Sequence, residues 1–165
     1  MSVTAYVYAP LTSTAIVPGS HNYCNGGSQG LDCLKSGSQG SAVRLYVSTN
    51  IKSVRFTRTN NCAPVCSQDH KNAVMVELFG DYNASGCYFG WVLYGHLQNP
   101  ITNQVWNVSV TKTVGYVVNY VQGQCSYYND DDHVHMEASL GNRLVSAYNP
   151  LTQGTTAIYS FIAAC

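Results

Sequence analysis

Short β-prone segments alternate with turn residues along almost the whole chain, and this pattern constrains the fold more than any other feature. The segments are rich in β-branched and aromatic residues, which favour strands. Asparagine, aspartate, glycine and proline, the residues typical of turns, separate them. Nowhere do apolar residues follow a 3.6-residue period over about twelve positions, so α-helices are not expected. Strands are predicted at residues 42–48, 51–57, 73–79, 88–94, 113–121, 133–139 and 156–162.

The spacing of these strands predicts an all-β protein, in which a mainly antiparallel sheet folds on itself and long loops join the strands. A length of 165 residues is enough for one domain with its own hydrophobic core. No internal repeat or domain boundary is apparent, so residues 1–165 are expected to form a single domain. Residues 19–40 are rich in glycine, serine, asparagine and glutamine and contain two cysteines. This composition predicts an ordered, disulfide-braced loop rather than a disordered linker.

Charged residues make up only 10% of the chain, and eight basic side chains balance eight acidic ones. A net charge of zero gives no long-range field that would attract nucleic acid or an anionic membrane surface. No apolar run approaches the ~20 residues that a membrane span requires. We therefore expect neither nucleic acid nor a membrane among the partners of this protein.

Seven cysteines are too many for a typical reduced cytosolic protein. Their spacing differs from that of a zinc finger, so disulfides and an extracellular location are the better interpretation. Because the number is odd, at least one thiol is left over or is paired outside the chain. The plausible pairs are Cys24 with Cys33, and Cys62 with either Cys66 or Cys87.

Two further features bear on secretion. Asn83-Ala-Ser and Asn107-Val-Ser match the acceptor pattern for N-linked sugar, which agrees with an oxidising route in a eukaryotic host. Residues 1–18 lack the basic start and the apolar stretch of a signal peptide. Secretion would thus require either a leader removed beforehand or another route out of the cell.

Two of the five histidines occur as His133-Val-His135, inside a predicted strand. Residues two apart in a strand face the same side, so the two imidazoles can share one metal ion or one substrate. A solvent-facing pair of histidines is the alternative. His96 follows an aromatic-rich strand in Tyr94-Gly-His-Leu97, where a hydrogen bond to a backbone carbonyl would be an ordinary structural role. Each motif alone is a modest signal.

In combination, the motifs resemble those of the lysostaphin-type zinc metalloendopeptidases of bacterial cell walls, the LytM/LasA-like family. That family has a His…Asp motif, then Tyr-x-His-Leu, then His-x-His followed by an aliphatic or aromatic residue and Glu. This chain has His21…Asp32, Tyr94-Gly-His-Leu97 and His133-Val-His-Met-Glu137 in the same order. The resemblance extends over about residues 16–145 and implies a lysostaphin/LytM-like β fold.

The resemblance also implies one zinc ion per chain, held by His21, Asp32 and His135, with a fourth position for water. It implies a catalytic role for His96 and His133, which would orient or deprotonate that water and donate hydrogen bonds to the tetrahedral oxyanion. Which of these two histidines has which role stays open.

Two further residues belong to the same motifs. Glu137 lies two positions beyond His135 on the same strand face, and we expect it to support the site rather than to act as a base. Tyr94 either lines the cleft or packs in the interior.

The chain departs from the family pattern in two places. The family's shortest metal motif has His and Asp four apart, whereas ten residues separate His21 from Asp32, so Asp69 and Asp81 are rival ligands. Residues 127–132, Tyr-Tyr-Asn-Asp-Asp-Asp, replace a small Ser/Thr-Gly-Pro approach to His-x-His. A solvated acidic turn is predicted for Asp130 to Asp132; the alternatives are binding of a second cation and exclusion of acidic substrates.

These inferences predict a secreted zinc-dependent endopeptidase that cleaves short Gly- or Ala-containing cross-bridges in bacterial peptidoglycan. One alternative is a catalytically inactive LytM-like protein with a binding or structural role. Another is a secreted β-sandwich, structural or carbohydrate-binding, whose histidines are incidental. In the peptidase, aromatic side chains would wall a narrow groove for a substrate of small residues. The candidates for these walls are Tyr88, Trp91, Tyr94, Trp106, Tyr127 and Tyr128.

Overall fold

The computed structural model describes residues 1–17, 25–59, 72–118 and 132–165. Within these ranges the chain is all-β, as predicted, with one short 3₁₀ helix, η1 (Tyr82–Ala84). The first seven strands are β1 (Ser2–Tyr8), β2 (Ser13–Ile16), β3 (Ser28–Leu34), β4 (Ala42–Leu45), β5 (Ser53–Thr59), β6 (Ala73–Phe79) and β7 (Tyr88–Gly95). The others are β8 (Leu97–Gln98), β9 (Gln104–Asn107), β10 (Lys112–Val117), β11 (His133–Ser139), β12 (Gly141–Arg143), β13 (Pro150–Leu151) and β14 (Ala157–Ala164).

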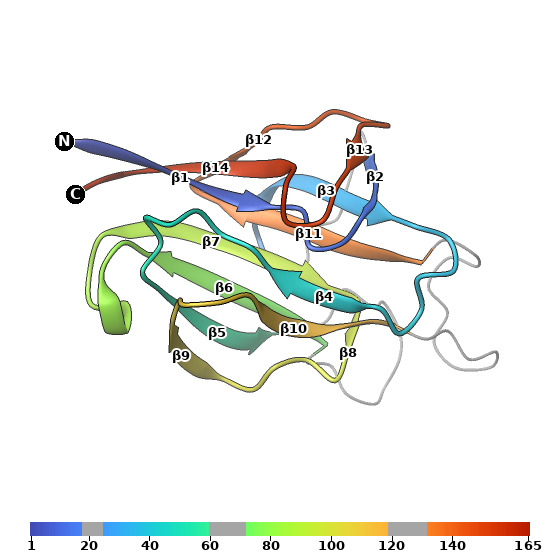
Figure 1. Cartoon of the computed structure of the whole chain (residues 1–165), viewed down its shortest axis with the longest axis horizontal. Helices are drawn as coiled ribbons and strands as arrows, with labels where there is room; N and C mark the ends of the chain where they lie inside the picture. Colours follow the sequence, from blue (N-terminus) through green and yellow to red (C-terminus); the bar gives the residue numbers. More distant parts are fainter. Residues whose placement is uncertain (18–24, 60–71, 119–131) are drawn as a thin grey trace.

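The strands form antiparallel sheets that pack on one another. The largest sheet has eight strands in the order β13-β2-β3-β11-β7-β6-β5-β9. Two three-stranded sheets, β1-β14-β12 and β4-β10-β8, lie over the long strands of this sheet (Figure 1). The predicted mainly antiparallel sheet folded on itself is therefore confirmed.

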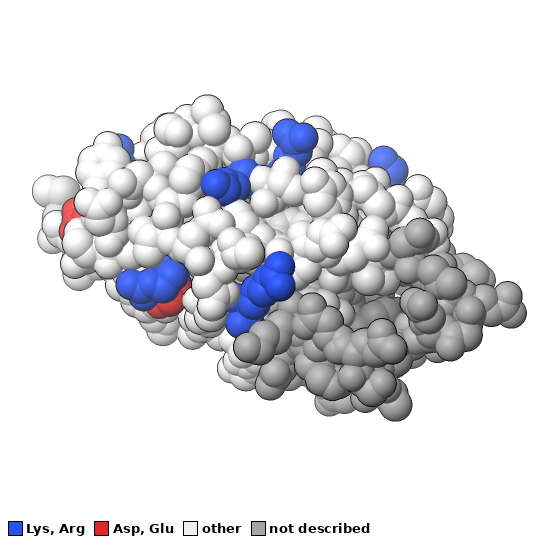
Figure 2. All heavy atoms as spheres, turned by 90° about the horizontal axis from the view of Figure 1, so that it is seen from below, with Lys and Arg blue, Asp and Glu red and all other residues white. Residues whose placement is uncertain are grey.

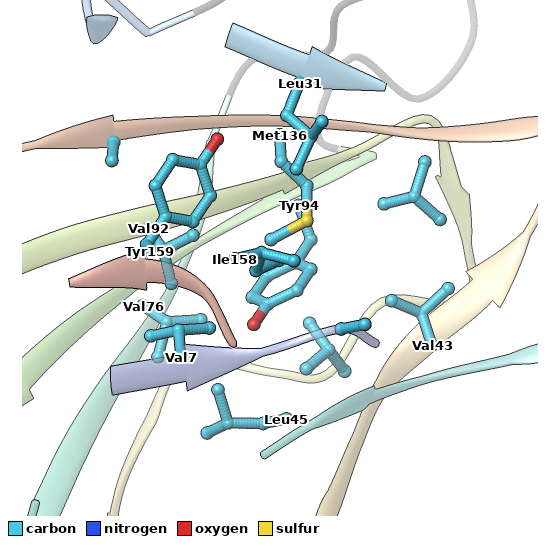
Figure 3. Packing of buried hydrophobic residues seen from close by; sticks show 14 of the residues in the cluster. Val7, Leu31, Val43, Leu45, Val76, Val92, Tyr94, Met136, Ile158 and Tyr159 are labelled. Carbon is cyan, nitrogen blue, oxygen red and sulfur yellow. The ribbon is translucent and has the colours of Figure 1, made fainter. Parts of the chain in front are cut away.

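One hydrophobic core lies between these sheets. Val7 from β1, Ile158 from β14 and Val43 from β4 face side chains of the large sheet (Figure 3). Tyr94 is fully buried among them, so it packs in the interior and does not line a cleft. The large-sheet side chains labelled there are Leu31, Val76, Val92, Tyr94 and Met136.

Strand β11 shows how the large sheet separates core from site. Val134, Met136 and Ala138 point into the core, as the two-residue alternation of a strand requires. His133, His135 and Glu137 point to the opposite face. His135 and Glu137 are nevertheless completely buried, so this second face is covered as well. Two buried polar groups on a central strand need partners, because unpaired burial of such groups is costly.

The structure corrects part of the strand prediction. The loop predicted at residues 19–40 is wrong where β3 lies, because Ser28–Leu34 pairs with β2 on one side and β11 on the other. Two short strands, β12 and β13, begin at Gly141 and Pro150, outside the predicted strands. The strand predicted at 113–121 ends at Val117, and residues 119–121 lie outside the described ranges.

The cysteines also differ from the prediction. Cys87 forms a disulfide with Cys165, 78 residues away, with a Cα–Cα distance of 5.4 Å. Cys33 is a free, buried thiol whose Sγ lies 3.7 Å from the Met136 sulfur. The predicted pairs Cys24–Cys33 and Cys62–Cys87 are therefore wrong, and Cys62–Cys66 falls outside the described residues. The observed disulfide is consistent with an oxidising, extracellular location.

Charged side chains are sparse on the surface. Figure 2 shows lysine and arginine side chains standing apart from one another on one face, with few acidic groups between them. Some of these charges have local partners: the Arg55 guanidinium lies 3.3 Å from a Glu77 carboxylate oxygen and sits over the Phe79 ring. No helix in the described part of the chain is long and apolar enough to cross a membrane.

Candidate functional site

Three adjacent central strands bring the predicted site residues together. In the sheet register, His135 on β11 lies opposite Asp32 on β3 and opposite Gly95 on β7. Residues that face each other in antiparallel strands project to the same side of the sheet. His135 Nδ1 consequently lies 3.3 Å from Asp32 Oδ1, with the His135 side chain fully buried and that of Asp32 20% exposed.

The other ring nitrogen of His135 contacts Glu137. His135 Nε2 lies 2.8 Å from Glu137 Oε2, and both side chains are inaccessible to solvent. The second carboxylate oxygen, Oε1, accepts the backbone N–H groups of Asn25 and Gly27, each at 3.0 Å. The imidazole is thus held between two carboxylates, and the buried carboxylate is itself satisfied.

The pKa of His135 reflects opposing effects. Burial disfavours the charged imidazolium, but hydrogen bonds to Asp32 and Glu137, together with the negative charges of both, raise the pKa above the ordinary 6.5. In the absence of a metal, the ring therefore holds its second proton more tightly than a solvated histidine does.

His96 and His133 complete the cluster. Their ring centroids are 4.9 Å apart in an edge-to-face arrangement, and the His96 ring is 5.8 Å from that of His135. His96 lies between β7 and β8 with a φ of 61°, a left-handed conformation that is uncommon for a residue with a side chain. This conformation turns the chain at the end of β7 and leaves His96 largely buried, at 8% exposure, beside the other two rings.

The structure therefore brings together four of the five predicted site residues: Asp32, His96, His133 and His135. The fifth, His21, lies outside the described ranges, as do the rival ligand Asp69 and the aspartates at 130 and 131. The other rival, Asp81, follows the far end of β6, a strand length of roughly 20 Å from the His96 end of the sheet. Asp81 is thus not a ligand of this site.

Asp132 is the one described residue of the acidic segment. Its backbone carbonyl accepts the Lys35 N–H at 3.0 Å, and its carboxylate accepts the Gln39 N–H at 3.2 Å. These contacts attach the start of β11 to the turn that follows β3. They are ordinary structural hydrogen bonds and identify no second cation site.

The Asp32–His135 pair has the separation expected of two zinc ligands. Zinc–nitrogen and zinc–carboxylate bonds of 2.0–2.2 Å place adjacent corners of a tetrahedron about 3.3 to 3.5 Å apart. The distance between Asp32 Oδ1 and His135 Nδ1 is 3.3 Å. The described residues contain no group of three or more His, Cys, Asp and Glu side chains arranged to hold a metal. The third ligand that the resemblance implies, His21, is not among them.

Sequence reasoning missed the contribution of Asn25 and Gly27, because backbone N–H donors have no signature in residue type. The clearest available signal is glycine itself at position 27. A Cβ atom added there would lie 2.8 Å from the Trp91 ring, 3.0 Å from Glu137 Oε1 and 3.1 Å from the Ala138 carbonyl oxygen. Only glycine allows the backbone to approach Glu137 this closely.

No family model matches the chain, and the searches of curated proteins and of solved structures return no match either. Function is therefore inferred from the site residues and their geometry.

Proposed function

We propose that this protein is a zinc-dependent metallohydrolase whose metal is held by Asp32 and His135, with His21 as the third ligand. The observation that carries the proposal is the 3.3 Å separation of Asp32 Oδ1 and His135 Nδ1, with two further histidines beside them. The donor set supports zinc, which binds imidazole nitrogen and carboxylate oxygen readily.

The surroundings of the pair also suit a bound cation. The metal-facing Nδ1 of His135 sits on a rigid central strand, and its opposite nitrogen is held by the buried Glu137 carboxylate. Such a carboxylate–histidine arrangement is typical of protein metal sites, where it orients the ring and increases its basicity. When bound, zinc would polarise a carbonyl oxygen and lower the pKa of water towards about 7.

His96 and His133 are the candidates for proton transfer and charge stabilisation. Their edge-to-face contact places two imidazoles on the same side of the sheet as the ligand pair. A neutral imidazole in such a pair can accept a proton from attacking water, while a ring N–H can donate a hydrogen bond to the oxyanion.

Within this class, we propose an extracellular endopeptidase that cleaves short Gly- or Ala-containing links in peptidoglycan. The support is the order of the motifs, which resembles that of the lysostaphin-type family. Trp91 lies opposite Ser139 of β11 on the site face of the sheet and is partly exposed, so it is the best-supported aromatic wall.

A paired comparison of two histidines on β11 tests the proposal. The purified protein should bind about one zinc ion per chain and hydrolyse pentaglycine or purified cell wall, and a chelator should abolish the hydrolysis. His133→Ala should lose hydrolysis but keep zinc, whereas His135→Ala should lose both. Because His135 is fully buried and His133 is only partly buried, far-UV circular dichroism of both variants checks that each keeps the β fold.

The same experiment separates the alternatives. Zinc bound without hydrolysis of any of these substrates would favour a binding or structural protein with the same fold. Absence of zinc from the wild-type protein, measured after purification without chelators and after reconstitution, would contradict the metallohydrolase proposal. It would leave the β-sandwich with incidental histidines.

A further inference from the structure

The buried carboxylate of Glu137 divides its two oxygens between two different tasks. Oε2 lies 2.8 Å from His135 Nε2, and Oε1 accepts two backbone N–H groups, from Asn25 and Gly27. A backbone N–H can only donate, so Oε1 must be an acceptor in both contacts. The orientation of the carboxylate is therefore set independently of His135, and Oε2 is presented to the ring as a second acceptor.

We propose that Glu137 is a positioning residue that keeps the proton of neutral His135 on Nε2 and so leaves the Nδ1 lone pair directed at the metal position beside Asp32. This inference rests on the proposed function for its metal-directed part. The competing tautomer would place the proton between Nδ1 and Asp32. That contact is longer, 3.3 Å against 2.8 Å, and Asp32 is 20% exposed whereas Glu137 is fully buried. Both differences favour the proton on Nε2, because a charge-assisted hydrogen bond is stronger when it is shorter and shielded from water.

The Glu137→Gln substitution is predicted to give the opposite tautomer of His135, with almost no change in the shape of the side chain at position 137. A glutamine side chain has one acceptor oxygen and one donor NH₂ group. Asn25 and Gly27 both require the oxygen, so the NH₂ group must face His135 Nε2. Nε2 then becomes an acceptor, the proton moves to Nδ1, and the lone pair needed by a metal is lost. The substitution thus reverses the tautomer while leaving both backbone hydrogen bonds in place.

The tautomer can be measured by ¹⁵N NMR of the imidazole of His135 in the metal-free protein, at alkaline pH where the ring carries one proton. Wild-type protein should show a protonated Nε2, and Glu137→Gln a protonated Nδ1. Glu77→Gln is the matched control: it removes a carboxylate from β6, which lies two strands from β11 in the same sheet and where Glu77 pairs with Arg55, and it should leave the proton on Nε2. Nε2 still protonated in Glu137→Gln would overturn the inference. So would Nδ1 protonated in the wild type, a result that holds even if the variant does not fold.

Zinc titration of the same three proteins tests the metal-directed part. Glu137→Gln should bind zinc at least ~10- to 100-fold more weakly than wild type, and Glu77→Gln should bind it equally well. Equal zinc affinity for wild type and Glu137→Gln would overturn the positioning role while leaving the proposed function intact. A wild-type protein with the expected tautomer but no affinity for zinc would overturn the proposed function, and with it the link between Glu137 and a metal.

Discussion

His96 joins an unusual backbone conformation to a place in the histidine cluster. Its φ of 61° lies in the left-handed region, which costs a residue with a side chain on the order of 1–3 kcal/mol unless its surroundings impose it. Backbone hydrogen bonds impose it here: the Val118 N–H donates to the His96 carbonyl, and the Leu97 N–H donates to the carbonyl of Asn72. Such positions are more frequent at functional sites, which agrees with the role proposed for His96.

His96→Asn separates the conformation from the chemistry. Asparagine adopts the left-handed conformation readily, so the free energy of unfolding should change by no more than about 1 kcal/mol. The imidazole is lost, so hydrolysis should fall by about 10²- to 10⁴-fold if His96 transfers a proton or stabilises charge. Chemical denaturation and hydrolysis of pentaglycine measure the two effects. Unchanged hydrolysis would show that His96 has only a structural role.

Cys33 and Asp32 are consecutive residues of β3, so their side chains point to opposite faces of the sheet. Asp32 faces the site, whereas the next residue, Cys33, faces the core. Burial, reinforced by the nearby Asp32 charge, raises the pKa of the Cys33 thiol to about 12. The thiolate is the reactive form of cysteine, so this residue should be chemically inert in the native protein.

Alkylation of the native protein checks this expectation. Between pH 8 and 9 an ordinary cysteine, with a pKa of about 8.5, is substantially ionised and reacts readily. Cys33 should stay unmodified in the native state at this pH and become modified once the chain is unfolded, as read by peptide mass mapping. Rapid native modification, or a disulfide between Cys33 and Cys24, would contradict the structure.

At the level of elements, strand β11 is the organising unit of the site. It supplies His133, His135 and Glu137 to one face, while Val134 and Met136 anchor the other face in the core. Glu137 then ties the segment preceding β3 to β11 through the Asn25 and Gly27 backbone. This connection holds Asp32 and His135 in register, because the tied segment leads directly into the strand that carries Asp32.

Gly27→Ala tests the hydrogen-bonded contact between Glu137 of β11 and the segment that precedes β3. The added methyl group would overlap Trp91, Glu137 and the Ala138 backbone, so we expect a loss of about 1–3 kcal/mol in the free energy of unfolding and weaker zinc binding. Gly86→Ala is the control, since its methyl group would meet only the movable Asp81 carboxylate at 2.8 Å. Chemical denaturation and zinc titration give the comparison. Equal effects of both substitutions would argue against a specific role for the close approach of the Gly27 backbone to Glu137.

At the level of the whole molecule, the Cys87–Cys165 disulfide joins the beginning of β7 to the end of β14. It closes a span of 78 residues, and the loop-closure entropy of the unfolded chain makes such a link worth about 2–4 kcal/mol. It also sits at the end of β7 that is remote from His96. The free energy of unfolding should therefore depend on this disulfide, whereas the geometry of the site should not.

Replacing both cysteines, as Cys87→Ala with Cys165→Ala, should lower the free energy of unfolding by about 2–4 kcal/mol. Zinc affinity at a temperature where the variant stays folded should be unchanged, because the site lies at the other end of the strand. Thermal and chemical denaturation, together with zinc titration, measure both quantities. A loss of zinc binding by the folded variant would show that the remote end of β7 positions the site.

The strands that were predictable from sequence are those with strong local signals. β6 and β11 have the predicted bounds: Val74, Val76 and Phe79 give β6 a strong strand signal, and β11 alternates apolar with polar residues over its whole length. β3 was not predictable, since Ser28–Leu34 begins in a glycine- and serine-rich stretch that resembles a loop. Its strand conformation comes from pairing with β2 and β11 on both edges, and strand formation depends strongly on such context.

By itself the sequence determined which chemical groups are available and which of them share a face: the His-x-His spacing in a strand puts both imidazoles on one side, whatever the partner strands are. Only the tertiary structure decided what stands opposite them. Asp32 meets His135 across 103 residues of chain, and Cys87 meets Cys165 rather than a nearer cysteine. Contacts of this kind depend on the order of strands in the completed sheets, and no local pattern of residues encodes that order.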